Sequence, residues 1–199
     1  EGNDGYGVHP GGGSVGSILR GCTFRDNGSD GIYYCLRVSD SLCEGNVMAG
    51  NGQDGISIGH RDERIIIRAN RVVGNRRSGI WYREDETDRT GHDTVIADNE
   101  FAGNGPEEGA VHIRLNARAE SVTIWGNRVL DGELLRAAKP EYLAGVSFAP
   151  PSRTTLDDEA SLRRRSRRLG VDPTCLTFQI RPADENGKLL GTKEMRDII

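Results

Sequence analysis

The sequence predicts an all-β chain folded as a right-handed parallel β-helix, with three short strands in each coil of about 24 residues. An Asn followed four residues later by a Gly recurs at a fixed 24-residue step: Asn3/Gly7, Asn27/Gly31, Asn51/Gly55 and Asn75/Gly79. A second column with the same step consists of Cys22, Asn46 and Asn70. A period of this length is typical of a solenoid built from stacked, nearly identical units.

One coil can be followed through residues 55–78. Gly55-Ile56-Ser57-Ile58 alternates between inward and outward side chains, as a half-buried strand does. Ile65 and Ile67 alternate in the same way in a second strand, and a third short strand begins at Val72. Each strand is then expected about 4.8 Å from its copy in the next coil.

Three apolar columns predict the interior of the stack. The first strands contribute Val8, Ile32, Ile56, Ile80 and Val111; the second strands contribute Leu19, Cys43, Ile67, Ile96 and Ile124; the third strands contribute Phe24, Met48, Val72, Phe101 and Val129. The turn column continues through Asn99 and Asn127. We expect Asn there because it tolerates left-handed backbone angles and can form a hydrogen-bonded ladder along the axis.

The later coils are longer, since 29 residues separate Asn70 from Asn99 and 28 separate Asn99 from Asn127. These steps predict loops inserted at residues 84–93 and near Pro106. Insertions on a solenoid often gather on its binding face. The acidic residues of the first loop could hold Ca²⁺, but their spacing matches no defined site, so we expect an ordinary solvated loop and no cofactor.

We expect a β-helix over residues 1–150 and an appendage over 151–199. The repeat weakens after Asp131, and residues 145–148 could supply one more first strand. Two prolines then predict a break, followed by a helix over 155–169 that could cap the open end of the stack, a strand over 175–181 and a hairpin near 185–187. Because Glu1 falls inside a coil, we expect further coils before it, together with any signal peptide.

Composition narrows the class of partner. The net charge is −4 and no basic stripe crosses the repeats, which makes nucleic acid an unfavoured partner. No apolar run approaches the roughly 20 residues needed to span a bilayer. Cys22, Cys35, Cys43 and Cys175 lack the spacing of a metal site, so we expect small packing residues and leave a disulfide open.

A run of glycines, Gly11-Gly12-Gly13-Ser14, falls in the turn after the first strand of the earliest coil. A phosphate-binding loop would need a Lys and a following helix. This run has neither, so we reject that function for it.

Side chains expected to point outward from the first strands form two rows. One is His9, Tyr33, Ser57, Trp81 and His112; the other is Gly11, Cys35, Gly59, Arg83 and Arg114, and the next turn adds Arg37, His60 and Arg61. Aromatic faces suit the CH-rich faces of sugar rings, and Arg suits a uronate carboxylate. With one member per ~4.8 Å, such a row predicts a linear track for an extended polysaccharide. The alternative is that aromatic stacking along the row only stabilises the sheet.

Residues 6 to about 130 resemble the right-handed β-helix region of the pectate-lyase-like superfamily, and within it the catalytic stretch of mannuronan C5-epimerases and related polysaccharide lyases. That family carries Tyr-Gly-Phe-Asp-Pro-His on a first strand, followed one coil later by a His-Gly-Ile segment. Here the corresponding runs are Tyr6-Gly7-Val8-His9-Pro10-Gly11 and Asp30-Gly31-Ile32-Tyr33, followed by Arg37-Val38-Ser39-Asp40-Ser41. Tyr6 is kept, whereas His9 stands at the position of the family's catalytic Asp and Gly11 at that of its catalytic His.

The resemblance implies a polysaccharide lyase or C5-epimerase acting on an acidic glycan, secreted or in the cell envelope. Such chemistry needs a base, an acid and a cation beside the carboxylate. We assign His9 as the base, Tyr33 as the acid and Arg83 or Arg114 as the neutralising cation. Further substrate contacts are expected from Tyr6, Ser57, His60, Trp81 and His112. The alternative is a non-catalytic glycan-binding module or a structural spacer of the cell envelope.

Overall fold

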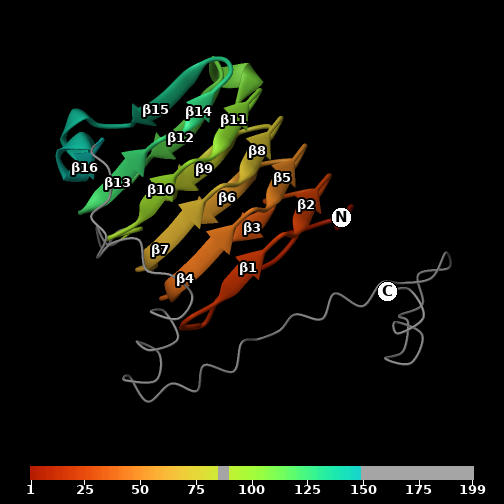
Figure 1. Cartoon of the computed structure of the whole chain (residues 1–199), viewed down its shortest axis with the longest axis horizontal. Coiled ribbons are helices and arrows are strands. Elements are labelled where there is room, and N and C mark those ends of the chain that lie inside the picture. Colours follow the sequence, from red (N-terminus) through yellow and green to blue (C-terminus); the bar gives the residue numbers. More distant parts are fainter. Residues whose placement is uncertain (85–89, 149–199) are drawn as a thin grey trace, which may run out of the picture.

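The computed structural model describes residues 1–84 and 90–148, which wind through three parallel sheets around one core (Figure 1). The first sheet has the order β15-β12-β9-β6-β3. Its strands are β3 (Ile32–Tyr33), β6 (Asp54–Ile58), β9 (Ser78–Tyr82), β12 (Val111–Leu115) and β15 (Glu133–Ala137). This arrangement confirms the predicted parallel β-helix with three strands in each coil.

The second and third sheets complete the coil. The second sheet contains β1 (Ile18–Arg20), β4 (Ser39–Glu44), β7 (Glu63–Arg68), β10 (Val95–Ala97), β13 (Val122–Trp125) and β16 (Val146–Ser147). The third contains β2 (Thr23–Arg25), β5 (Val47–Ala49), β8 (Arg71–Val73), β11 (Glu100–Ala102) and β14 (Arg128–Val129). Two short 3₁₀ helices, Pro106–Glu108 and Pro140–Gly145, lie between strands of the later coils.

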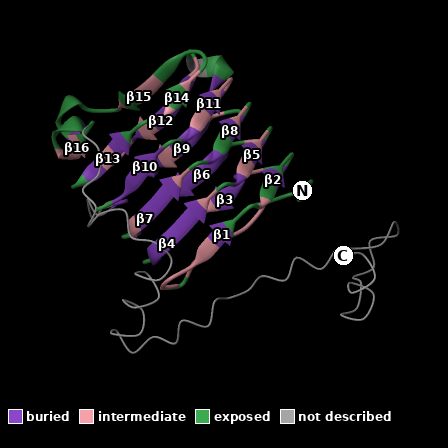
Figure 2. Ribbon diagram, in the orientation of Figure 1, coloured by how far each residue is buried: buried purple, intermediate pink, exposed green. Residues whose placement is uncertain are grey.

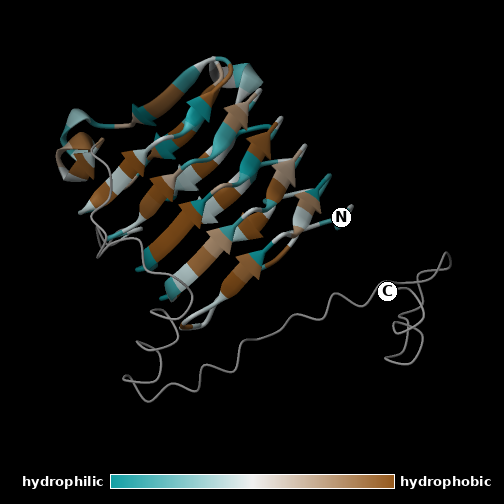
Figure 3. Ribbon diagram, in the orientation of Figure 1, coloured by the Kyte–Doolittle hydropathy of each residue, from teal (hydrophilic) through white to brown (hydrophobic). Residues whose placement is uncertain are grey.

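The strand registers place the predicted apolar columns in the interior. Leu19 pairs with Cys43 in the second sheet and Phe24 with Met48 in the third, and both columns continue to Ile124 and Val129 as expected. Figure 2 shows the buried residues running along the strands, and Figure 3 shows that the strands carry the apolar residues while the turns are polar. The core is therefore a continuous column along the axis.

Two ladders of Asn side chains flank the third sheet. In the ladder Cys22, Asn46, Asn70, Asn99 and Asn127, each Asn Oδ1 accepts the backbone N–H of the residue one coil before it. Asn70 Nδ2 also donates to Asn99 Oδ1 at 2.9 Å and to the Cys43 carbonyl oxygen at 2.9 Å. The second ladder, Asn3, Asn27, Asn51, Asn75 and Asn104, repeats the pattern. These bonds confirm the predicted ladder.

The second ladder also explains the recurring Gly. A Cβ built at Gly31 would lie 2.7 Å from the Gly55 carbonyl oxygen and 2.9 Å from Asn51 Nδ2. Only Gly leaves room for the next coil's carboxamide. The left-handed residue is the one before each Asn, for example Gly45 (φ 63) and Ala69 (φ 54), so the expectation of left-handed Asn was wrong.

Two predicted registers also need correction. Ile113, not Val111, pairs with Ile80, because the insertion near Pro106 shifts β12 by two residues. The predicted extra first strand at residues 145–148 was also wrong, because β16 pairs with β13 in the second sheet and the first-sheet strand of that coil is β15. Both differences arise where the 24-residue step is lost.

The second sheet is apolar on its outer face as well. Leu42, Ile66, Val95 and Ala97 form a second buried cluster there. No helix among residues 1–84 and 90–148 has the length and apolar character to cross a membrane. The predicted break at residues 150–151, the helix over 155–169, the strand and the hairpin fall outside the described residues.

Candidate functional site

An aromatic cluster lies on the outer face of the first sheet in its earliest coils. Val8 bridges to Ile32, which places the next residues, His9 and Tyr33, beside each other. Tyr6 stacks on Tyr33 with ring centres 4.2 Å apart, and the His9 ring stands edge-on to both, 5.0 Å from Tyr33 and 5.5 Å from Tyr6. The structure therefore brings together three of the residues that the sequence assigned to the site.

Arg83 lies flat against the sheet. Its guanidinium occupies the space above Gly59, where a Cβ would come within 2.7 Å of Nε. Nη1 donates to Ser57 Oγ at 2.6 Å, Nη2 donates to the Tyr34 carbonyl oxygen at 2.6 Å, and Cζ lies 4.0 Å from the centre of the Tyr33 ring. Arg83 is therefore buried and covers Ser57, so the expectation that both project into solvent was wrong.

Burial, Arg83 and Cys35 together determine the protonation state of the Tyr33 phenol. Burial raises the pKa of Tyr33 to about 12, and a hydrogen bond with the Cys35 thiol adds to this, while the Arg83 charge acts in the opposite direction. The Tyr33 phenol therefore stays protonated at neutral pH and can donate a hydrogen bond or a proton.

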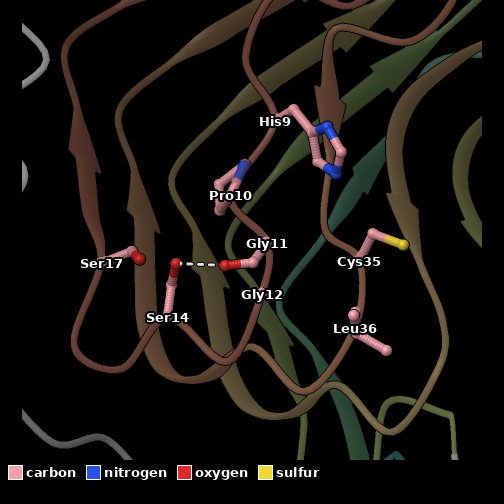
Figure 4. Close-up of a pocket in the computed structure, with 8 residues that line it drawn as sticks. All are labelled: His9, Pro10, Gly11, Gly12, Ser14, Ser17, Cys35 and Leu36. Atoms are coloured by element: carbon pink, nitrogen blue, oxygen red, sulfur yellow. Dashed lines mark hydrogen bonds between the residues drawn. The ribbon is translucent and has the colours of Figure 1, made fainter.

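A cavity of about 410 Å³ opens beside this cluster (Figure 4). Figure 4 shows His9 at one end of it and Cys35 and Leu36 of the next coil on one side. On the other side the Ser14 hydroxyl donates to the Gly11 carbonyl oxygen at 2.6 Å. The cavity is lined by His9, Pro10, Gly11, Gly12, Ser14, Ser17, Cys35 and Leu36. Its walls combine apolar surface with hydroxyl, thiol and imidazole groups.

A charged cluster that sequence reasoning missed begins at the Trp81 ring. The Arg77 guanidinium lies 3.6 Å from the centre of the Trp81 ring and so covers one of its faces. Arg77 also pairs with Asp54, whose backbone N–H donates to Asp30 Oδ1 at 2.9 Å. Burial, followed by repulsion from Asp54, raises the pKa of Asp30 to about 7, against the opposing effects of that N–H and of Arg77. The Asp repeated at a 24-residue step, Asp30 and Asp54, is the sequence signal from which this pair follows.

The corner between the first and second sheets carries the three cationic residues that the sequence placed in the turn after the first strands, Arg37, His60 and Arg61. Leu36 and Arg37, and one coil later His60 and Arg61, occupy the left-handed backbone region. All four are exposed, so His60 lies on the corner and not in the aromatic row. A second cavity, of about 330 Å³, is lined here by Arg37, Ser39, Arg61, Glu63 and His92.

His112 and Arg114 do not lie where the sequence placed them. Arg114, not His112, pairs with Trp81. His112 is fully buried, stacks on Phe101, and ends the second Asn ladder by accepting from Asn104 Nδ2 at 3.1 Å. Its Nε2 donates to the Asp131 carbonyl oxygen at 2.6 Å. His112 therefore closes the ladder and cannot contact a substrate.

Metal-ligating groups do not converge in the described part of the chain, where no cluster of three or more His, Cys, Asp or Glu could hold an ion. Most of the acidic loop considered for Ca²⁺, residues 85–89, lies outside that part. Cys22, Cys35 and Cys43 are free thiols, and Cys43 packs in the core as expected.

Comparison with known proteins gives one match. A family model described as the right-handed beta helix region matches residues 1–101, about half of the chain. No curated protein and no solved structure matches the sequence.

Proposed function

The chain belongs to the family of the right-handed beta helix region, and from this membership we propose that it binds an acidic polysaccharide along the outer face of its first sheet. Family membership suggests a polysaccharide-related role, and the aromatic cluster supports the finer statement. The exposed Tyr6 and the partly exposed Tyr33 stack with their ring centres 4.2 Å apart beside a cavity wide enough for a sugar ring. The stacked pair is the observation on which this proposal rests.

The charge of the ligand is argued from the neighbouring cations. Hydrogen bonds to Ser57 and to the Tyr34 carbonyl oxygen hold the Arg83 guanidinium against the Tyr33 ring. Its charge makes the electrostatic potential at the aromatic cluster more positive, although the side chain stays packed on the sheet. Exposed cations stand on the corner beside the cavity, including Arg37 and Arg61. A uronate polymer lying on the Tyr6–Tyr33 cluster could place carboxylates within reach of this corner. A secreted or cell-envelope location and the exclusion of nucleic acid stay predictions from the sequence.

Binding is tested on the full chain with alginate, pectate and glycosaminoglycan oligosaccharides, against a neutral glucan. We expect the acidic series to bind and Tyr33→Ala to weaken that binding about tenfold, since buried aromatic anchors carry most of the energy of an interface. Trp125→Ala is the matched control, because Trp125 is an exposed aromatic residue on the second sheet. Equal loss in both variants, or no binding by the parent chain, would refute the proposal.

A second candidate function is catalysis, as a lyase or C5-epimerase, favoured by the 5.0 Å approach of the His9 and Tyr33 rings. His9 is exposed and would take the proton beside the carboxylate, and the protonated Tyr33 would supply one. The resemblance to mannuronan C5-epimerases supports a catalytic role at the position of His9, although His9 replaces the Asp of that family and Gly11 replaces its His.

Catalysis is tested by the ultraviolet absorbance of unsaturated products and by proton exchange at C5 on the same three polymers. His9→Ala should lower turnover at least ~10²-fold with nearly unchanged affinity, because proton transfer acts only in the transition state. Binding without either signal on any polymer would leave the chain a non-catalytic module.

A further inference from the structure

We propose that the cavity at the corner between the first and second sheets is an oxyanion site, in which Arg37, Arg61 and His92 bind a carboxylate or sulfate group. The inference rests on the proposed function when that group belongs to the polysaccharide. It then names the residues that would bind the negative charges of the polysaccharide. Three kinds of observation carry it: the arrangement of the donors, the pairing of the neighbouring arginines, and the backbone of the corner.

The donors converge on one cavity from three successive coils. Arg37 and Arg61 occupy the same turn position one coil apart, as the bond from Arg37 N–H to the His60 carbonyl oxygen shows. The adjoining wall is formed by Ser39 and Glu63, the first residues of β4 and β7, and by His92 of the next coil. Ser39 pairs with Glu63, and Glu63 forms a backbone bridge to His92. The cavity of about 330 Å³ exceeds the needs of a single carboxylate or sulfate group and leaves room for part of a sugar ring.

His92 is fixed as a donor. Its Nδ1 accepts the backbone N–H of Glu120 at 2.9 Å, so in the neutral ring the proton resides on Nε2. An Nε2–H group adds a hydrogen-bond donor beside the two guanidinium groups. Anions are bound by such convergent donors, and Arg offers a planar pair of N–H groups to a carboxylate or sulfate.

The pairing of arginines distinguishes this corner from the rest of the surface. Arg64, three residues after Arg61, donates two hydrogen bonds to the Asp40 carboxylate. Arg20 and Arg68 both donate to the Glu44 carboxylate. Within residues 1–84 and 90–148, by contrast, no carboxylate pairs with Arg37 or Arg61. Glu63 is the one acidic group described at this cavity, and it bonds Arg64. The corner therefore keeps an excess of positive charge.

The backbone that presents these cations is strained and held. Arg37 (φ 67) and Arg61 (φ 66) lie in the left-handed region, where the earliest coil has Gly12 and Gly13. A non-Gly residue in that region is strained by contacts of its Cβ, and such strain gathers at functional sites. Buried Asp62 fixes the turn, since its Oδ1 accepts Val38 N–H and its Oδ2 accepts Gly59 N–H, both at 2.9 Å. The two guanidinium groups are therefore presented on a fixed backbone.

The test titrates the full chain with sodium sulfate, sodium galacturonate and the neutral sugar galactose at constant ionic strength, and follows the His92 imidazole resonances by NMR. We expect sulfate or galacturonate to shift them saturably and galactose to leave them unchanged, and the two anions distinguish the sulfate from the carboxylate source. The double variant Arg37→Gln/Arg61→Gln should weaken this binding at least tenfold. Arg20→Gln, which removes an ion-paired arginine from β1, is the control and should change it less than twofold.

The outcomes separate this inference from the proposed function. Oligosaccharide binding that survives Arg37→Gln/Arg61→Gln, with His92 insensitive to both anions, overturns the oxyanion site and leaves the aromatic site in place. Anion binding at His92 without any oligosaccharide binding supports the site and refutes the polysaccharide as its ligand. Equal weakening by Arg20→Gln would show general charge attraction and would also overturn the site.

Discussion

The turns on the two sides of the third sheet are built alike in successive coils as far as Asn104 and Asn127, whereas the corner between the first and second sheets changes from coil to coil. Each ladder turn has one left-handed residue followed by Asn, or by Cys22 in one case, and bonds to its copies one coil away. At the corner the left-handed pair is Gly12-Gly13, then Leu36-Arg37, then His60-Arg61. The third corner is followed by a coil with an inserted loop.

This difference follows from where each side chain finds its partner. A ladder Asn bonds to the equivalent residues above and below and to a strand carbonyl oxygen of the coil before it, so a change in one coil leaves groups unpaired in its neighbours. A corner side chain points into solvent or into a cavity and can vary without that penalty. In this solenoid, stability is therefore expected to concentrate on the repeated turns and function on the variable corner.

The largest expected effect is that of Asn70→Ala on the ladder side. Asn70 accepts the backbone N–H and the Nδ2 of Asn46, and donates to Cys43 O and Asn99 Oδ1, all in the buried interior. Its loss should lower the free energy of unfolding by ~3–5 kcal/mol, because several buried groups lose their partners together. Urea denaturation measures the change.

The control for that variant is Asn3→Ala, at the exposed end of the other ladder. Since water can replace the lost bond, we expect a loss below ~1 kcal/mol. Similar losses in the two variants would contradict the assignment of stability to the buried part of the ladders.

A smaller effect, dependent on pH, is expected from the Asp30–Asp54 pair beside the second ladder. Burial first, and then the Asp54 charge, raise the pKa of Asp30 to about 7 from an ordinary value of 3.8. A folded state that holds this proton more tightly is stabilised at low pH, and that contribution is lost as the pH rises from about 4 to about 7. The change for a shift of this size is at most ~4 kcal/mol.

The pH effect is measured by urea denaturation at pH 5, 6, 7 and 8. Asp30→Asn keeps an oxygen to accept Asp54 N–H and removes the titrating group, so its stability should fall less over this range than that of the parent chain. Buried Asp62, whose pKa burial raises to about 6, contributes the same sign and remains in both proteins. The exposed Asp26→Asn is the control and should follow the parent curve; a parallel curve for Asp30→Asn would refute the assignment.

The same division explains what the sequence could predict. The columns of the first four coils follow from the fixed step, because each strand pairs with its copy. The insertion near Pro106 shifted β12 by two residues, and no residue count predicts how many residues a loop absorbs. His112 was therefore placed in the aromatic row, although it ends the second ladder.

The candidate site was predicted only in part. Strand alternation correctly placed His9 and Tyr33 side by side, since the bridge between Val8 and Ile32 brings the two following residues into register. Alternation gives the direction of Cβ and not the path of a long side chain, so it missed that Arg83 runs back over Gly59 and buries Ser57. The sequence did place Arg37, His60 and Arg61 in the turn at the corner, but not the left-handed backbone that presents them, because a left-handed Leu or Arg leaves no pattern in sequence.

The smallest predicted effect is found by comparing one left-handed residue of a ladder turn with one left-handed residue of the corner. Ala69 (φ 54) precedes a ladder Asn, and Leu36 (φ 71) lies at the corner and lines the first cavity. Replacing either with Gly relieves a strain of ~1–2 kcal/mol but adds freedom to the unfolded chain, so each should raise the free energy of unfolding by about 0.5–1 kcal/mol. Ala69→Gly should leave oligosaccharide binding unchanged, whereas Leu36→Gly should weaken it because it removes part of the cavity wall. Urea denaturation and titration with the same acidic oligosaccharides measure both quantities.

A stabilised Leu36→Gly variant with full affinity would show that the strained corner serves no ligand at the first cavity. Destabilisation by Leu36→Gly would show that the leucine side chain contributes more than its strain costs.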